Sequence, residues 1–550
     1  MAEKNFAVTP SVSIARSKFD RVSTHKTAIR LGDIVPIYCD EVLPGDTRSI
    51  DYGSLIRMST PIFPIMDDID MELFAFFCPS RLTWDKWKEF CGENNTTAGF
   101  SDSDYVIPQA KCGIGFYKNM VNSADKGYLL GDYLGVTNNY DIVGQNNNSA
   151  TFSVSALPYR AYHLICNRWF RNQNLEAPKV ISINSTDVTA SPENYLYWEK
   201  CRVASKKADY FTKSLPYAQK GQPVMLPLGT SAPIVTEKTM HSFSIPVKFG
   251  IGSQVANGAL GVNGADHLYV GQDGTGPTQA GSVTSTNLVA DLSTATAATI
   301  NQLREAYALQ LALEKDSLYG TRYWEILYGH FGITSPDATL QDPEFLGHAK
   351  ININIEQVLQ TTGYVADDTS ALGAVGANSV SGNKGSLFTK SFVEHGYIFI
   401  MAVARHRESY GQGINRMFTR KRRFDFYWPS FAHLGSQAVE KGAIFQTGTA
   451  ADNEIFGYQE AWAEYRYKPN QVSSFMNPAN NNSLDAWTLA SRFESAPSLS
   501  TSFTKVNRNS LSRALTTGSN GPDFICDFFF KDTAVRPMPL YSIPGLLGEL

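Results

Sequence analysis

The sequence contains little charge for its length. Only 18% of its 550 residues are charged, 48 basic and 52 acidic, which leaves a net charge of −4. A nucleic-acid-binding domain of the basic type has a strong positive excess, and this chain has none. If the chain surrounds a nucleic acid, local basic patches or a separate basic partner must therefore neutralise the phosphates.

Cysteines are also few, and no pattern of a disulfide or metal framework is present. The seven lie at positions 39, 78, 91, 112, 166, 201 and 526, with no Cys-x-x-Cys pair. Their apolar surroundings predict reduced, buried thiols in a reducing compartment. The N-terminus leads into no apolar signal segment, and the longest apolar run, 397–404, is too short for a membrane span. We therefore expect neither secretion nor membrane insertion.

Aromatic residues, in contrast, are frequent. They make up 12% of the chain, with 32 Phe and 26 Tyr. Large protein interfaces are rich in aromatic residues and poor in charge at their centres, so this composition suits a chain that packs against copies of itself. It suits an aromatic-rich β-sandwich enzyme equally well.

Strand patterns dominate the sequence. Apolar and polar residues alternate over 524–531, which predicts a strand with one buried face. Residues 34–39 and 397–404 are short continuous apolar runs, typical of strands buried on both faces. The proline- and glycine-rich connections favour an antiparallel β-sandwich over alternating βαβ units.

Three helices are expected between the strands. Residues 299–313 show helical apolar spacing after a capping box of Thr299 and Gln302. Pro158 is placed to begin a second helix, and residues 84–90 predict a short third. Residues 250–298 and 367–385 are polar and small, so they cannot fill a core. We expect surface excursions there, the first with or without short strands of its own.

One acidic run is the best indication of an enzyme. Asp68, Asp70 and Glu72 would share one face of a strand, as calcium ligands or glycosidase carboxylates do. The alternative is a solvated face whose opposite side is buried, and this is the reading we favour. We expect no catalytic residues, no cofactor and no metal.

A basic cluster is the main candidate site. Five cations lie within eight residues, at Arg416, Arg420, Lys421, Arg422 and Arg423, followed by the aromatic residues of 424–428. Arginines beside aromatic rings are typical of single-strand nucleic-acid binding. Carboxylates such as Glu460 and Glu464, on this or another subunit, are the alternative partners, and we lean slightly towards them.

Ordered motifs along the chain carry a resemblance. They are residues 16–21 (RSKFDR), 24–27 (THKT), 41–46 (EVLPGD), 57–64 (RMSTPIFP), 301–304 (NQLR), 320–323 (GTRY), 330–332 (HFG), 334–337 (TSPD), 394–397 (EHGY), 425–429 (DFYWP), 432–435 (AHLG), 457–460 (GYQE), 463–469 (AEYRYKP) and 536–545 (RPMPLYSIPG). With these motifs the chain resembles the major capsid proteins of Microviridae, in the gokushovirus branch. The resemblance fails in the two polar segments, and the acidic run is unusual for the family.

The resemblance implies an eight-stranded viral jelly roll with long insertions. It further implies a T=1 icosahedral shell of this chain around circular single-stranded DNA, found in the virion and assembled in the bacterial cytoplasm. The implied partners are an internal scaffolding protein, a DNA pilot protein and a small basic packaging protein. A host surface receptor is also implied, without indication of what it is.

The expected organisation has three parts. Residues 1–228 hold the N-terminal part of the jelly roll with helical insertions, 229–298 a variable surface insertion at the threefold axes, and 299–550 the remainder. Within the last part we expect a variable loop at 366–386 and an extended C-terminal arm at 536–550, on a neighbouring subunit or on its own. A β-sandwich carbohydrate-active enzyme and a lectin-like adhesion module are the rival interpretations.

Overall fold

A computed structural model describes residues 14–93, 105–113, 128–136, 151–189, 200–225, 300–359, 361, 373, 375–518 and 521–542, together with short strands between 234 and 290. The chain divides into two compact units, Met1–Ala218 with Asp316–Leu550, and Gln219–Lys315. Among the described residues, no helix has both the length and the apolar character needed to cross a membrane.

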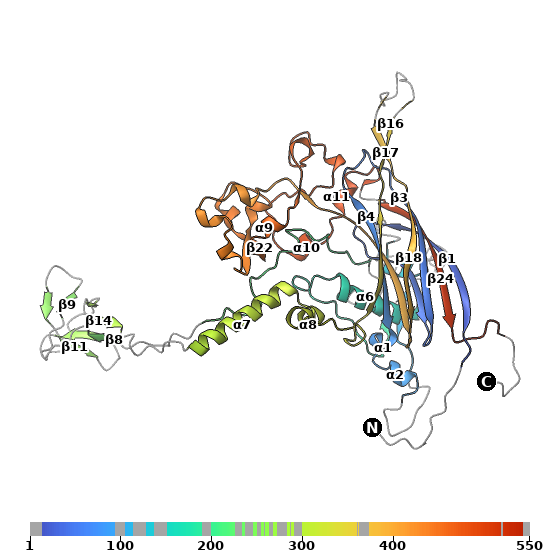
Figure 1. Cartoon of the computed structure of the whole chain (residues 1–550), viewed down its shortest axis with the longest axis horizontal. Coiled ribbons are helices and arrows are strands. Elements are labelled where there is room, and N and C mark those ends of the chain that lie inside the picture. Colours follow the sequence, from blue (N-terminus) through green and yellow to red (C-terminus); the bar gives the residue numbers. More distant parts are fainter. Residues whose placement is uncertain are drawn as a thin grey trace, which may run out of the picture. The chain divides into compact units, whose positions relative to one another are not determined.

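Eight long strands of the larger unit form two antiparallel four-stranded sheets (Figure 1). The first sheet has the order β1 (Ser17–Ile29), β24 (Phe524–Arg536), β3 (Thr47–Met58) and β18 (Ser381–Ser391). The second has the order β15 (Glu344–Asn352), β4 (Ile69–Pro79), β19 (Gly396–His406) and β2 (Val35–Val42). Strand β24, from the end of the chain, thus lies between two strands from its first 60 residues.

The inner faces of the two sheets share one core. Along β24, Phe524, Phe528 and Phe530 are at most 1% exposed, whereas Ile525 and Phe529 on the alternate positions are exposed. Phe530 packs against Tyr38 of the second sheet, with ring centroids 5.1 Å apart. Because a fully buried Phe contributes about 2–3 kcal/mol, this alternation is a main source of sandwich stability. The predicted strand at 524–531 is confirmed.

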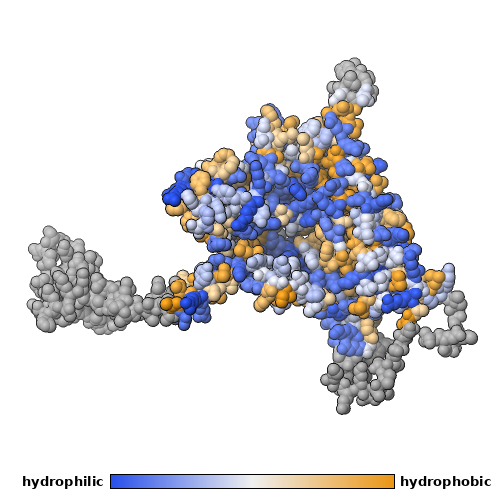
Figure 2. Space-filling model, in the orientation of Figure 1, coloured by the Kyte–Doolittle hydropathy of each residue, from blue (hydrophilic) through white to orange (hydrophobic). Residues whose placement is uncertain are grey.

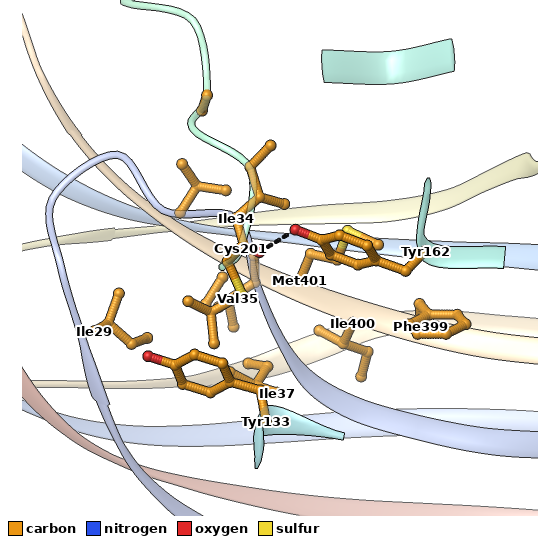
Figure 3. Close-up of a cluster of buried hydrophobic side chains, with 14 of the residues drawn as sticks. Ile29, Ile34, Val35, Ile37, Tyr133, Tyr162, Cys201, Phe399, Ile400 and Met401 are labelled. Atoms are coloured by element: carbon orange, nitrogen blue, oxygen red, sulfur yellow. Dashed lines mark hydrogen bonds between the residues drawn. The ribbon is translucent and has the colours of Figure 1, made fainter. Parts of the chain in front are cut away.

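The second sheet is also covered on its other face. Helices α1 (Ser80–Thr83) and α6 (Leu157–Ile165) and the π-helical turn η2 (Cys166–Phe170) pack there. Rings of η2 contact rings of β4: the Phe76 and Trp169 centroids are 5.8 Å apart. Ten of the eleven residues of β19 are buried, so the prediction of a strand buried on both faces is confirmed. Figure 3 shows Tyr133 and Tyr162 among the aliphatic side chains there; Tyr162 Oη donates to the Ile34 carbonyl at 2.8 Å.

The helices agree with the sequence in part. α6 begins at Leu157 with a proline in its first turn, as expected. The helix expected from 299 is α7 (Ile300–Tyr319), whose predicted cap Thr299 lies outside the described residues, and α8 (Tyr323–Phe331) follows it. The single helix expected at 84–90 is wrong, because Trp84 lies in extended backbone between α1 and the separate turn α2 (Trp87–Phe90).

Both segments expected at the surface contain strands, a possibility that the sequence left open for 250–298 but not for 367–385. In the segment 366–386, β17 (Val375–Asn378) pairs with β16 (Glu356–Leu359), and residues 381–386 form the first half of β18. The first half of β18 was not predicted because its residues are mostly polar and exposed, so the sequence shows no apolar alternation there. The strands within 229–298 are β8 (Ile234–Thr236), β9 (Pro246–Phe249), β10 (Val255–Asn257), β11 (Ala259–Val262), β12 (Leu268–Gly271), β13 (Val283–Ser285) and β14 (Leu288–Ala290).

Smaller elements complete the larger unit. They are α4 (Leu130–Tyr133), the sheet of β5 (Gln109–Gly113), β6 (Thr151–Ser155) and β7 (Val188–Thr189), and, after β19, β20 (Ser409–Tyr410), β21 (Ser436–Glu440), β22 (Ile455–Glu460), α9 (Ala463–Arg466), β23 (Asn470–Gln471), α10 (Thr501–Thr504) and α11 (Asn509–Ser512). The part after β19 has its own apolar cluster around Tyr410, Ile444 and Phe456.

The described cysteines are all free thiols. Cys78, Cys166, Cys201 and Cys526 are buried, as predicted. Cys39 is exposed and so is Cys91, so the expectation of burial is wrong for these two. The side chain of Cys112 lies outside the described residues.

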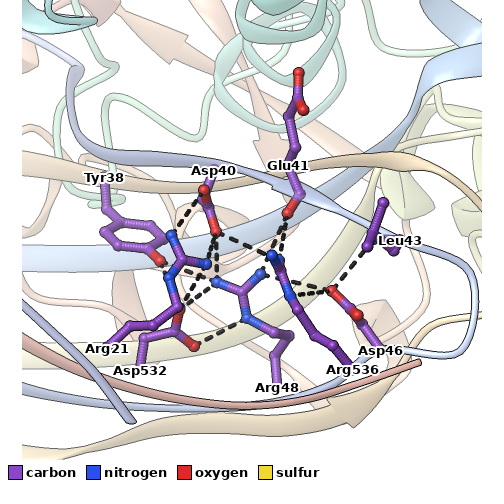
Figure 4. A network of polar contacts seen from close by, with 9 residues as sticks. All are labelled: Arg21, Tyr38, Asp40, Glu41, Leu43, Asp46, Arg48, Asp532 and Arg536. Atoms are coloured by element: carbon purple, nitrogen blue, oxygen red, sulfur yellow. Dashed lines mark hydrogen bonds and ion pairs between the residues drawn. The ribbon is translucent and has the colours of Figure 1, made fainter. Parts of the chain in front are cut away.

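A buried polar network joins β24 to the strands around it (Figure 4). Arg48 has a fully buried side chain whose Nε donates to Asp532 Oδ1 at 2.9 Å, while its Nη2 pairs with Asp532 Oδ2 and with Asp40 at 2.7 Å. At the end of the strand, Arg536 Nε lies 3.0 Å from Asp46 Oδ2. Each buried carboxylate therefore has a cation, which is the condition for keeping charge inside a protein.

Candidate functional site

The basic cluster lies in three single-turn 3-10 helices after β19. They are η3 (Arg416–Phe418), η4 (Arg423–Asp425) and η5 (Pro429–Phe431). Asp425 holds the turn between the first two, because its Oδ2 accepts the backbone N–H groups of Lys421 at 2.8 Å and Arg422 at 2.6 Å. These hydrogen bonds favour the ionised carboxylate and lower the pKa of Asp425. The anion thus keeps consecutive cations in one tight turn.

Two of the five cations are bound to a carboxylate of the same chain. Arg420 Nη2 donates to Glu464 Oε1 at 2.9 Å, and Arg416 Nε lies 3.8 Å from the same oxygen. The Arg420 side chain is only 7% exposed, and its guanidinium lies 4.5 Å from the centre of the Tyr465 ring. Arg416 also donates to the Ala438 carbonyl at 2.9 Å. Arg416 and Arg420 therefore hold α9 against η3 and have little capacity left for an outside anion.

The other three cations are exposed. Lys421 and Arg422 form no ion pair with any other residue that the structure describes. Arg423 lies 4.8 Å from the centre of the Trp428 ring and 5.5 Å from that of Phe424. Large apolar side chains of the same segment are exposed as well, namely Met417, Phe418, Phe424, Phe426, Tyr427 and Trp428. The surface thus combines free cations with rings that bases could stack on.

A cavity of about 500 Å³ lies beside the cluster, and no sequence pattern predicted it. Its cationic lining residues are Arg416, Arg420, Lys421 and Lys468, and its acidic ones are Asp425, Glu440, Asp452 and Glu464. Since the two signs balance, the cavity does not select anions by charge. Residues 463–469, which line one side, were visible only as a family motif and not as part of a site.

The two carboxylates considered as partners of the cluster have different roles. Glu464 binds the cluster from its own chain, as one of the expected alternatives. Glu460 instead pairs with Arg466 and does not contact the cluster. Whether the exposed cations meet DNA or a neighbouring subunit stays a prediction.

The acidic run is not the solvated face we favoured. Asp70 is 2% exposed and pairs with Lys207 and with Lys350, whose Nζ lies 3.1 Å away; Glu72 is 8% exposed and pairs with Arg405. Asp68 precedes β4 and is exposed, so the three carboxylates do not share one face. Among the described residues, no three His, Cys, Asp or Glu side chains are grouped to hold a metal ion. The two buried carboxylates are structural because lysines and an arginine already neutralise them.

Known proteins resemble the chain over its full length. The model of the family described as capsid protein (F protein) matches residues 7–546. Capsid protein VP1 of Bdellovibrio phage phiMH2K is 38% identical over 100% of this chain and 98% of its own length. Capsid protein VP1 of Chlamydia phage 1 is 34% identical over 99% and 98%, and that of Spiroplasma virus 4 is 34% identical over 98% and 97%. The chain therefore belongs to the F-protein family of capsid proteins and is a structural major capsid protein of the Microviridae, gokushovirus branch, as its motifs predicted.

Proposed function

We propose that this capsid protein builds a closed T=1 icosahedral shell around a circular single-stranded DNA genome, with an eight-stranded viral jelly roll as its wall. Assembly takes place in the bacterial cytoplasm with an internal scaffolding protein, a DNA pilot protein and a small basic packaging protein. Pentamers are the intermediates. The small basic protein offsets the genome phosphates that a coat of net charge −4 cannot neutralise.

The strand order supports the jelly roll. Counting only the eight long strands in chain order, the first sheet reads 1-8-3-6 and the second reads 5-4-7-2. Consecutive strands thus alternate between the two sheets, except that the fourth and fifth are neighbours in the second sheet. Two interleaved Greek keys have this order, and viral capsid walls use it. This order carries the jelly-roll part of the proposal. Lectin domains share the order, so the capsid part rests on the family match over residues 7–546.

We assign host attachment to the insertion at residues 229–298. Its composition of Gly, Ala, Ser and Thr cannot fill a core, and it falls within a compact unit separate from the sandwich. In the shell this unit projects at the threefold axes and meets the host receptor. The C-terminal arm was expected from 536, but Arg536 is the last residue of β24 and pairs with Asp46 of its own chain. We therefore assign the neighbouring subunit as the partner of the arm from 538 to 550.

Size-exclusion chromatography and negative-stain microscopy of the purified chain, alone and co-expressed with a scaffolding protein, test the shell. Shells or pentamers support the proposal. A stable monomer under every condition would overturn it and favour the carbohydrate-active enzyme or the lectin-like module.

We assign the exposed cations Lys421, Arg422 and Arg423 to the genome. They are the members of the cluster without a carboxylate of their own, and exposed rings surround them. From the sequence alone we slightly preferred carboxylates as partners of the whole cluster. We now propose DNA for these three cations, because Glu464 pairs with Arg416 and Arg420 instead.

A triple change of these cations to Gln separates the two partners. If they bind DNA, particles should assemble with less DNA. The slope of log K against log salt concentration for single-strand binding should also become shallower by about 0.7 for each lost contact. If they bind a neighbouring subunit, assembly should weaken while the DNA per particle stays constant. A matched control removes three charges elsewhere, by Lys26→Gln, Lys384→Gln and Lys531→Gln on the first sheet.

A further inference from the structure

Helix α8 is firmly attached to its own subunit. Its first turn is closed by Glu325, whose carboxylate accepts the backbone N–H of Arg322 at 2.9 Å, and it ends at Gly332 with φ +69°. The Arg322 side chain donates to the carbonyls of Arg168 at 2.9 Å and Arg171 at 3.2 Å. These bonds join α8 to the end of η2, so its position does not depend on its apolar residues.

One side of α8 packs against the preceding helix. A side chain at Gly329 would come within 2.5 Å of the Tyr319 ring, so this glycine allows the close approach. His330 Nε2 lies 2.8 Å from Oδ1 of Asp316, which also belongs to the preceding helix α7. The two contacts fix the rotation of α8 about its axis.

The opposite side of α8 is apolar, and the described part of the chain leaves its three residues Tyr323, Tyr328 and Phe331 exposed, with Trp324 and Leu327 half-buried beside them. At 3.6 residues per turn, Tyr323, Trp324, Leu327, Tyr328 and Phe331 fall on one side of the helix, away from Gly329. Tyr323, Tyr328 and Phe331 are 61%, 59% and 70% exposed, and no residue of the helix is buried. Ile333 extends the face beyond the helix at 60% exposed. Figure 2 shows hydrophobic residues at the surface where α8 lies. We call these six residues the α8 face.

The size of this face is that of an interface. Aromatic side chains bury about 150–250 Å² each when covered, so the exposed parts of the α8 face offer roughly 400–500 Å². A stable interface buries about 800 Å² per partner, and the largest apolar patch of a typical monomer is about 300–600 Å². The α8 face alone therefore supplies about half of one partner's share.

We propose that the α8 face is a subunit contact, covered by a second copy of this chain in the shell. None of its six side chains is charged, which fits the centre of a protein interface and excludes a nucleic-acid phosphate as the occupant. Every copy displays the same face, so a repeated assembly covers it once per subunit. The inference rests on the proposed shell and adds the surface through which copies meet.

The double variant Tyr328→Ser/Phe331→Ser tests the proposal in the full chain, under the conditions in which wild type forms shells. The variant should keep the far-UV spectrum and thermal midpoint of wild type, because these side chains contact little of their own subunit. Half-assembly should require at least about 30-fold more protein, the effect of losing one aromatic anchor. Phe475→Ser, which removes a ring that is 59% exposed elsewhere, should leave assembly unchanged.

A photo-crosslinking residue at position 328 identifies the occupant in assembled wild-type-like particles. A product of twice the subunit mass supports the second copy. A product of another mass, or assembly of the double variant at the wild-type concentration, overturns the α8 contact while leaving the shell proposal intact. Failure of wild type to form shells would instead overturn the proposed function.

Discussion

Replacing Arg48 by Met should lower the free energy of unfolding by about 3–5 kcal/mol, because the buried carboxylate of Asp532 loses its bidentate partner and keeps Arg21, whose Nη1 lies 3.5 Å away. The Arg48 side chain is 0% exposed and Asp532 is 1% exposed, so water cannot take over the interaction. Two guanidinium nitrogens of Arg48 contact the two oxygens of this carboxylate. Methionine keeps much of the length of the arginine side chain, so the loss measures charge more than volume.

A second change should restore most of the loss. In Arg48→Met/Asp532→Leu the carboxylate that lost its bidentate partner is gone as well, while Asp46 keeps Arg536 and Asp40 keeps Arg21. We expect the double variant to regain at least about 2 kcal/mol relative to Arg48→Met, since replacing both partners of a buried pair is often nearly neutral. The coupling energy between the two positions is the quantity to determine.

Urea unfolding of the subunit, followed by tryptophan fluorescence and far-UV circular dichroism, measures these differences where both probes report one transition. Lys26→Met is the control: its side chain is 72% exposed and its partner Asp527 is 41% exposed, so less than about 1 kcal/mol should be lost. A loss below about 1 kcal/mol for Arg48→Met would refute the reasoning. So would a double variant whose loss of stability equals the sum of the two single losses, because the two positions would then be uncoupled.

Three further predictions concern other parts of the chain. His406 is 2% exposed and burial lowers its pKa, so the unfolded chain binds the extra proton first and stability should fall as pH decreases below about 6.5; urea unfolding of His406→Phe should show a smaller loss between pH 7 and pH 5 than wild type. Removing residues 538–550, which leaves Arg536 in place, should block assembly yet give a soluble subunit, as chromatography would detect; unfolding of the subunit would place the arm on its own chain. Replacing residues 250–295 by a short Gly/Ser linker should leave the sandwich folded by circular dichroism and reduce host attachment, because loop-closure entropy changes slowly with length; collapse of the fold would assign the segment to the core.

The sandwich could be predicted from the sequence where burial on a face follows a simple period. The alternation in β24 and the apolar run of β19 predicted both strands with the correct faces. The polar strand β18 was missed in part because an edge strand with one exposed face has no strong apolar signal. The acidic run of β4 was misread for a related reason: its cationic partners Lys207 and Arg405 are remote in sequence.

The candidate site shows the same limit. The sequence placed five cations together, but it could not separate the pair held by Glu464 from the three that remain exposed, because α9 follows some forty residues later. The α8 face was also invisible as a contact. From sequence alone, a short apolar helix is expected to be buried in the core. The packing of Gly329 against Tyr319 shows which side of α8 faces its own subunit and which side is exposed.

The position of β24 has a consequence for synthesis of the protein on the ribosome. β1 and β3 leave the ribosome early, yet β24, the strand that joins them, is made only after residue 523. Until then both strands present unpaired edges, which are sites of aberrant association. A chain that terminates early lacks β24, Asp532 and Arg536 together, so it cannot complete the first sheet. We therefore expect translation products that end before β24 to be excluded from the particle, because their first sheet is incomplete.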